Sequence, residues 1–171
     1  MDINDTAAAD VQVNERIQSI FINSQYLKNY QTVSQVRDLP PIYHDEPVDL
    51  GGMDSGPTPL EATLCALNAC TAMIINILRR EMKFEMGGLR FETEGRHDIR
   101  RVEMKRTGKL FSEVEPIARH YHKVIQKAYI ETSESDERLE EMRAKVHKLC
   151  PLHALLADAK VDFDFQWIRS A

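Results

Sequence analysis

The clearest pattern in the sequence is an uncharged stretch over residues 62–78, in which apolar side chains fall on nearly every face of a helix. Thr58, Pro59 and Glu61 precede it as an N-cap, a proline at the first helical position and a capping-box partner. As a helix, the stretch is about 26 Å long, slightly short of a ~30 Å hydrocarbon core, and it carries hydrogen-bonding side chains. The pattern therefore predicts the buried central helix of a globular fold.

Other segments predict shorter elements around this helix. Residues 13–27 carry apolar side chains at helical spacing and predict an N-terminal helix, although residues 32–36 further on suit a strand. Residues 89–93 and 99–104 alternate between apolar and polar, which predicts two strands joined by a turn near Gly95.

The C-terminal third predicts a strand, two helices and a last strand. Residues 117–130 alternate over a long stretch, and residues 136–149 carry one apolar stripe, typical of an amphipathic helix that ends at Cys150. A short helix follows Pro151, and residues 161–167 alternate again as a strand. Strands and helices do not alternate regularly, so the fold class is α+β.

Residues 38–59 contain five of the seven prolines and three of the seven glycines, which predicts a long loop leading into the central helix. A loop of about 20 residues is uncommon in a compact domain and is usually functional. With 171 residues, the chain is expected to form one domain over 1–171. Residues 1–12 are expected to be disordered, 13–36 to form an N-terminal segment and 37–59 to form the functional loop.

Composition narrows the function classes. Apolar residues make up 43% and charged residues 29%, as in soluble globular proteins, and no secretory signal or membrane bundle is predicted. A net charge of -5 offers no basic field for nucleic acid. Three cysteines are too few for a disulfide scaffold, so the expected compartment is a reducing cytosol.

The cysteines are the main candidates for chemistry. Cys70 projects with Leu67, Ile74 and Ile77 on one apolar face, and Cys65 projects from the opposite side. The simplest interpretation of both is that of small buried core residues. Cys150 precedes Pro151, and a position at a helix N-cap favours a thiolate.

Neighbouring residues leave alternatives open. His147 and His153 flank Cys150 and, with Cys65 or Cys70, supply ligand types for zinc, but their spacing matches no standard zinc site, and we expect no metal or cofactor. Arg37 precedes the functional loop and is ordinarily a solvated charge, whereas Glu61 is the capping-box partner of Thr58.

Two motifs together point to a family. The stretch DEPVDLGGMDSGPTPLEATLCALNACTAM, followed some eighty residues later by CPLHALLADAKVDF, resembles the OsmC/Ohr family of thiol-dependent peroxidases, particularly its broad OsmC-like branch. The motifs have the order and separation found in the family, and the resemblance covers roughly residues 30–168. It implies an α+β fold with long central Cys-bearing helices packed against curved antiparallel sheets, and an interlocked homodimer with the active site at the subunit interface.

The resemblance also implies a mechanism. Cys70 attacks a hydroperoxide, Cys150 condenses with the resulting sulfenate, and a dithiol such as a lipoylated or thioredoxin-like protein reduces the disulfide. An arginine and a glutamate, here Arg37 and Glu61, keep the first thiol ionised, and residues 37–59 form the active-site loop. An apolar pocket formed by the Cys70 face favours organic hydroperoxides, since only these gain from burying carbon. The alternative is a non-catalytic small-ligand-binding or interaction protein on the same fold.

Overall fold

The computed structural model describes residues 17–114, 116 and 120–170, and its strands form two three-stranded sheets. The N-terminal sheet contains the antiparallel strands β1 (Asn23–Lys28), β2 (Gln31–Gln35) and β3 (Ile42–His44). The C-terminal sheet contains β4 (Gly88–Arg96), β5 (Lys123–Glu131) and β6 (Asp162–Ser170). Because β5 is antiparallel to β4 and parallel to β6, this second sheet is mixed, and the α+β class is confirmed.

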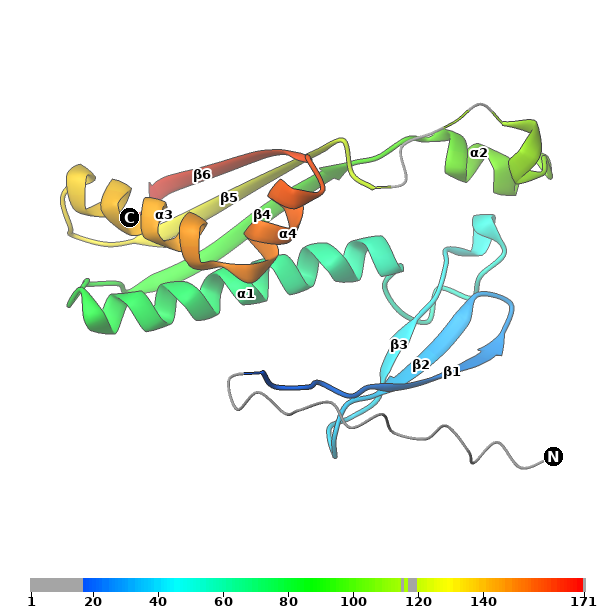
Figure 1. Cartoon of the computed structure of the whole chain (residues 1–171), viewed down its shortest axis with the longest axis horizontal. Coiled ribbons are helices and arrows are strands. Elements are labelled where there is room, and N and C mark those ends of the chain that lie inside the picture. The colour runs from blue at the N-terminus through cyan, green and yellow to red at the C-terminus, as the bar shows by residue number, and fades with distance from the viewer. Residues whose placement is uncertain (1–16, 115, 117–119, 171) are drawn as a thin grey trace.

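Four α-helices complete the described fold: α1 (Pro59–Glu81), α2 (Arg100–Thr107), α3 (Asp136–Leu149) and α4 (Pro151–Asp158). Short 3-10 turns occupy Val48–Leu50 and Phe111–Glu113. Figure 1 shows α1 running along the C-terminal sheet together with α3 and α4, while β1–β3 form a separate sheet near the N-terminal end of α1. The core therefore lies between α1, α3 and the C-terminal sheet.

The start of α1 is the one that the sequence predicts. Thr58 is the N-cap, Pro59 is the first helical residue, and the Glu61 carboxylate accepts hydrogen bonds from Thr58 N at 2.8 Å and Thr58 Oγ1 at 2.9 Å. The predicted burial on nearly every side is wrong for the single chain, because only Leu67, Thr71, Ile75 and Leu78 are buried on this helix. One apolar face of α1 is therefore left uncovered.

By length and composition, α1 alone among the described helices is also long and apolar enough to cross a membrane. One such helix is weak evidence for a membrane span, because core helices of globular proteins share both properties.

The predicted N-terminal helix is wrong over its described part. Residues 17–22 are not helical, and β1 begins at Asn23. Asn29 has a φ of 52° in the tight turn between β1 and β2, a conformation that asparagine tolerates better than most residues. In this hairpin, β1 pairs with β2, which lies where the sequence predicted a strand. The pairing of the two strands outweighs the helical spacing of apolar residues in β1. Residues 13–16 lie outside the described part.

The predicted strand over residues 89–93 is confirmed by β4, whereas the predicted turn near Gly95 and the second strand over residues 99–104 are wrong. β4 runs through Gly95, where a Cβ atom would lie 2.4 Å from the Tyr121 ring, so glycine is required for ring packing and not for a turn. Residues 99–104 belong largely to α2, which ends at Gly108 with a φ of 69°. β5 begins at Lys123, so residues 120–122 of the predicted strand do not belong to it, and residues 117–119 lie outside the described part.

The predictions for the other C-terminal elements are confirmed. α3 ends at Leu149, Cys150 separates it from α4, and β6 follows as the last strand. The long loop is more structured than expected, because it includes β3 and the turn Val48–Leu50.

Candidate active site

The structure brings Cys70 and Cys150 together, although 80 positions separate them in the sequence. The Cys150 thiol donates to the Cys70 sulfur with a separation of 3.3 Å between the two Sγ atoms. A disulfide has a length of about 2.05 Å, so the sulfurs need to approach each other by just over 1 Å to form one. Both thiols are free, and Cys65 is exposed on the same helix as Cys70 and not buried as the simplest interpretation expected.

The two thiols differ in their access to solvent. Cys150 is 1% exposed, whereas Cys70 is half-buried. Burial raises the pKa of Cys150, even though the backbone N–H groups of Leu152 and His153 favour its thiolate without completing a side-chain cap. The proximity of the Cys70 thiol raises the pKa of Cys150 further. The sequence-based expectation that the N-cap position makes Cys150 more acidic is therefore wrong, because burial outweighs the helix N-terminus.

A buried polar network lies beside the sulfur pair, and sequence reasoning did not identify it. Thr71, Gln126 and His153 are each at most 1% exposed. His153 Nε2 lies 3.0 Å from Thr71 Oγ1 and 3.3 Å from Gln126 Oε1. Gln126 Nε2 donates to Asn68 Oδ1 at 2.8 Å. The available signal was a glutamine in register with the apolar residues Val124, Ala128 and Ile130 on the buried face of β5, because a buried amide needs hydrogen-bond partners.

Glu61 and Arg37 are placed away from hydrogen-bonding contact with Cys70. Glu61 is exposed and serves the capping box of α1. Arg37 is exposed, with a φ of 51°, and among the described residues its guanidinium forms no hydrogen bond or ion pair. Their proposed role in keeping Cys70 ionised stays a prediction.

The three predicted pocket residues lie in different environments. Leu67 is buried in a core cluster with Tyr121, Ile74 is partly buried against the core, and Ile77 is 59% exposed. In the single chain they do not form one continuous wall beside Cys70. Their role as a substrate pocket also stays a prediction.

The loop before α1 is organised by Asp45, which is 1% exposed. Its carboxylate accepts from the backbone N–H groups of Glu46, Met53 and Ser55 and from the Ser55 hydroxyl. Burial alone would raise the pKa of Asp45, but these hydrogen bonds outweigh burial and lower it. An ion pair of 2.6 Å between Lys105 Nζ and Glu46 Oε1 also ties the loop to α2. Asp45 and Glu46 thus hold the loop in place through their contacts.

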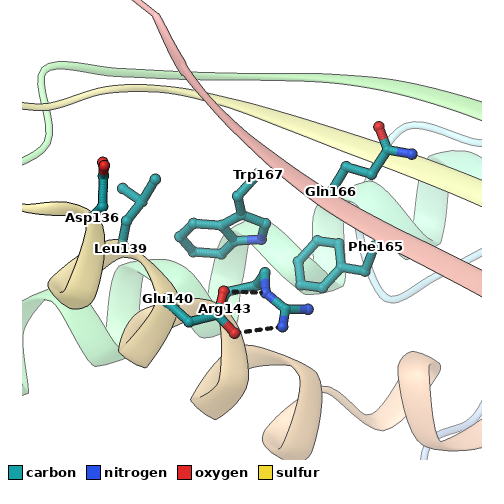
Figure 2. A pocket seen from close by; sticks show the side chains of 7 residues that line it. All are labelled: Asp136, Leu139, Glu140, Arg143, Phe165, Gln166 and Trp167. Atoms are coloured by element: carbon teal, nitrogen blue, oxygen red, sulfur yellow. Dashed lines mark hydrogen bonds and ion pairs between the residues drawn. The ribbon is translucent and has the colours of Figure 1, made fainter.

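A cavity of about 400 Å³ lies between α3 and β6 and contains neither Cys70 nor Cys150. Figure 2 shows the apolar side chains that line it, Leu139, Phe165 and Trp167, beside the ion pair of Glu140 and Arg143. Its remaining lining residues are Asp136 and Gln166. It holds no nucleophile that could react with a peroxide, so the sulfur pair is the stronger candidate site. Within the described residues, no group of three or more His, Cys, Asp or Glu side chains is placed to hold a metal ion.

Comparison with known proteins gives the fold a family. The family model "OsmC-like protein" matches residues 52–166. No curated protein sequence matches the chain. The solved structure of an OsmC-like protein from Mycoplasma pneumoniae is 15% identical, with a TM-score of 0.71, and the match covers 90% of this chain and 99% of that one.

Two further structures are described as organic hydroperoxide resistance proteins. The one from Elizabethkingia anophelis has a TM-score of 0.66 at 13% identity, over 90% of this chain and 98% of its own. The one from Legionella pneumophila, called OsmC, has a TM-score of 0.60 at 16% identity, over 91% and 98%. At these identities the structures establish the fold alone, whereas the family model covers most of the sequence. The chain belongs to the OsmC-like family.

Proposed function

We propose that this protein is a thiol-dependent peroxidase that reduces organic hydroperoxides through a reversible disulfide between Cys70 and Cys150. The observation that carries the proposal is the 3.3 Å separation of two free thiols from distant parts of the sequence. A second thiol at this distance traps a sulfenic acid before further oxidation. The similar structures from Legionella pneumophila and Elizabethkingia anophelis, both described as organic hydroperoxide resistance proteins, support the same class of reaction.

The difference in exposure assigns the two roles. Cys70 is the more accessible thiol, so its thiolate attacks the terminal oxygen of the hydroperoxide. The O–O bond breaks, an alcohol leaves with a proton, and Cys70 becomes a sulfenic acid. The buried Cys150 thiolate then attacks the Cys70 sulfur, which forms the disulfide and releases water after protonation. Two electrons from the thiols thus reduce one hydroperoxide.

An external dithiol completes the cycle. Exchange with a lipoylated or thioredoxin-like protein in a reducing cytosol restores both thiols and leaves the oxidised donor. Apolar side chains around α1 favour an organic hydroperoxide over hydrogen peroxide, because burying carbon contributes about 25 cal/mol per Å². The proposed site also includes Arg37 and Glu61. We place it at the interface of a homodimer.

The proposal is tested with one equivalent of cumene hydroperoxide on the reduced protein, followed by peptide mapping. We expect a linkage between Cys70 and Cys150 and turnover of the peroxide when a dithiol is supplied. With Cys150→Ser, the sulfenic acid on Cys70 should persist and over-oxidise, because no second thiol traps it. With Cys70→Ser, Cys150 should stay reduced at low peroxide.

Cys65→Ala is the matched control, because Cys65 is exposed on the same helix and alanine suits a helix well. This variant should retain wild-type turnover. Unconsumed peroxide with all thiols free in the wild-type protein would contradict the peroxidase proposal and favour a binding protein on the same fold.

A further inference from the structure

We infer that His153 is a positioning residue for the sulfur pair, because its imidazole joins the first turn of α4 to α1 and β5. This inference rests on the proposed function, since it concerns the geometry in which Cys70 and Cys150 form their disulfide. Among the described residues, the hydrogen-bond partners of its ring are Thr71 and Gln126, not the two sulfurs, so it acts through the elements that carry them.

His153 contacts the surroundings of both cysteines. Cys150 is the N-cap of α4, and His153 lies three residues later, in the first turn of the same helix. On the other side, the His153 ring lies 3.0 Å from the hydroxyl of Thr71, the residue that follows Cys70 on α1. One side chain therefore connects the two backbone segments whose relative position sets the distance between the sulfurs.

The hydrogen bonds define the protonation of the ring. Thr71 Oγ1 donates to Leu67 O at 2.8 Å, so it accepts from the ring nitrogen. Gln126 Oε1, at 3.3 Å, is a second acceptor for the same nitrogen. These contacts assign the hydrogen to Nε2 and leave Nδ1 as the unprotonated nitrogen of a neutral imidazole.

Packing holds the ring in the same place but is separable from these polar contacts. Phe163 and Phe165 lie edge-on to it, each with a ring-centroid distance of 4.7 Å. A leucine at position 153 retains apolar contact with both rings but cannot donate to Thr71. A glutamine retains a donor at roughly the position of Nε2. The two substitutions therefore separate positioning from packing.

The geometry makes the link to α4 important for disulfide closure. The sulfurs must approach each other by just over 1 Å, and a disulfide tolerates only narrow ranges of Cα separation and dihedral angle. Without the bond to Thr71, apolar packing alone holds the first turn of α4 against α1, and the turn shifts more easily. The closed geometry is then reached less often, and the disulfide becomes easier to reduce.

The test is a thiol–disulfide equilibrium in glutathione buffer at pH 7, carried out in a Cys65→Ala background. The reduced protein and glutathione disulfide give the Cys70–Cys150 disulfide and two molecules of reduced glutathione, so electrons balance without a peroxide. We expect His153→Leu to lower the equilibrium constant at least tenfold and His153→Gln to recover it to within threefold of the wild type. Thr71→Val should lower it several-fold.

Thr63→Val is the control, because the Thr63 hydroxyl bonds only to Pro59 O within α1 and the residue is exposed. It should leave the equilibrium constant unchanged. If His153→Leu does not fold, Thr71→Val decides the question, since valine matches threonine in shape. If His153→Leu folds and its equilibrium constant is unchanged, the inference is overturned. If His153→Leu does not fold, an unchanged constant in Thr71→Val overturns it. A loss in His153→Gln equal to that in His153→Leu also overturns it.

The glutathione measurement is independent of peroxide chemistry. If wild-type protein forms the disulfide in glutathione but consumes no cumene hydroperoxide, the proposed function fails and the positioning role of His153 is still measured. If the peroxide is consumed and the His153 variants match the wild type in glutathione, the positioning role of His153 fails and the proposed function stands.

Discussion

His153 brings an ionisable ring into the apolar region between α4 and β6, where it is 1% exposed. Its Nδ1 atom is buried and has no hydrogen-bond partner among the residues that the structure describes. A proton on Nδ1 would place a charge in this region without a counter-ion, and the ring of His147, 5.4 Å away between centroids, would oppose it. Burial is the larger effect, and together they lower the pKa of His153 to about 4.

This lowered pKa predicts a pH dependence of stability. The ordinary pKa of histidine is 6.5, so between pH 6.5 and pH 4 the unfolded chain binds a proton that the folded chain refuses. The contribution to stability is fully present above pH 6.5 and is lost as the pH falls toward 4. The shift corresponds to about 3 kcal/mol.

Urea unfolding of the reduced protein between pH 7.5 and pH 4 measures this dependence. The free energy of unfolding should fall less steeply in His153→Gln than in the wild type, because glutamine does not titrate. His122→Gln, which removes an exposed histidine, should keep the wild-type slope. Equal slopes in wild type and His153→Gln would show that His153 does not titrate as its burial implies.

Among the elements, those with local signals could be predicted from the sequence. The capping box at Thr58 and the proline at position 59 define the start of α1 without any tertiary contact. The apolar stripe of α3 is buried through Leu139, Met142 and Val146, so its helical period reflects real packing. The apolar positions of the β6 alternation, Phe163, Phe165 and Trp167, lie in or against the hydrophobic core.

Elements whose conformation depends on distant contacts could not be predicted in this way. Over β1, within the described part of the segment that was predicted as a helix, hairpin pairing with β2 outweighs the helical spacing. Gly95 reads as a turn residue in the sequence, yet it is needed because the Tyr121 ring packs where a side chain would lie. The sequence does contain signals for α2. They are its charged, helix-forming residues and Gly108, which ends the helix in a left-handed conformation.

The candidate site could likewise be predicted from the sequence only in part. The resemblance of two motifs paired Cys70 with Cys150, and the 3.3 Å contact agrees with it. Burial raises the pKa of Cys150, and His153 contacts Gln126 on β5 and the Phe163 and Phe165 rings on β6. No local sequence pattern specifies this burial or these contacts.

The loop before α1 provides a prediction at the scale of the element. A Cβ at Gly52 would lie 1.8 Å from the backbone oxygen of Glu46, so the loop can close only with glycine there. Gly52→Ala should displace residues 45–55, weaken the hydrogen bonds to Asp45 and lower stability by about 1–3 kcal/mol. Hydrogen exchange at the Met53 and Ser55 amides should accelerate, because both donate to Asp45.

Gly88→Ala is the control for this prediction. Its Cβ would meet the end of the flexible Glu131 side chain at 2.9 Å, which can move at little cost. The Met53 and Ser55 amides should exchange at wild-type rates in this variant. Unaltered exchange in Gly52→Ala would show that the loop accommodates the added methyl group without opening.

At the scale of the molecule, the single chain leaves much apolar surface uncovered. All six residues of β1 are exposed, and Phe21 and Ile20 just before it are more than 80% exposed. The accessible surface is 12729 Å², whereas a folded monomer of 19.7 kDa exposes about 8,600 Å². Setting aside up to about 2,600 Å² for the first 16 residues, the remaining excess is about 1,500 Å². A standard interface buries only about 800 Å² per partner, so the excess is enough for an extensive dimer.

We therefore expect a homodimer, held by the uncovered face of α1 and by the N-terminal sheet. Met73 and Ile77 are 67% and 59% exposed on α1, and introducing charge there would bury unpaired carboxylates in an apolar interface. Light scattering of wild-type protein at micromolar concentration, without detergent, should give twice 19.7 kDa. The double variant Met73→Glu and Ile77→Glu should shift the mass toward the monomer. Ile99→Glu, at a residue that is 60% exposed beside α2, should remain dimeric. A monomeric wild-type protein would contradict this prediction and the proposed place of the site at a dimer interface. The contact between Cys70 and Cys150 lies within one chain and would persist.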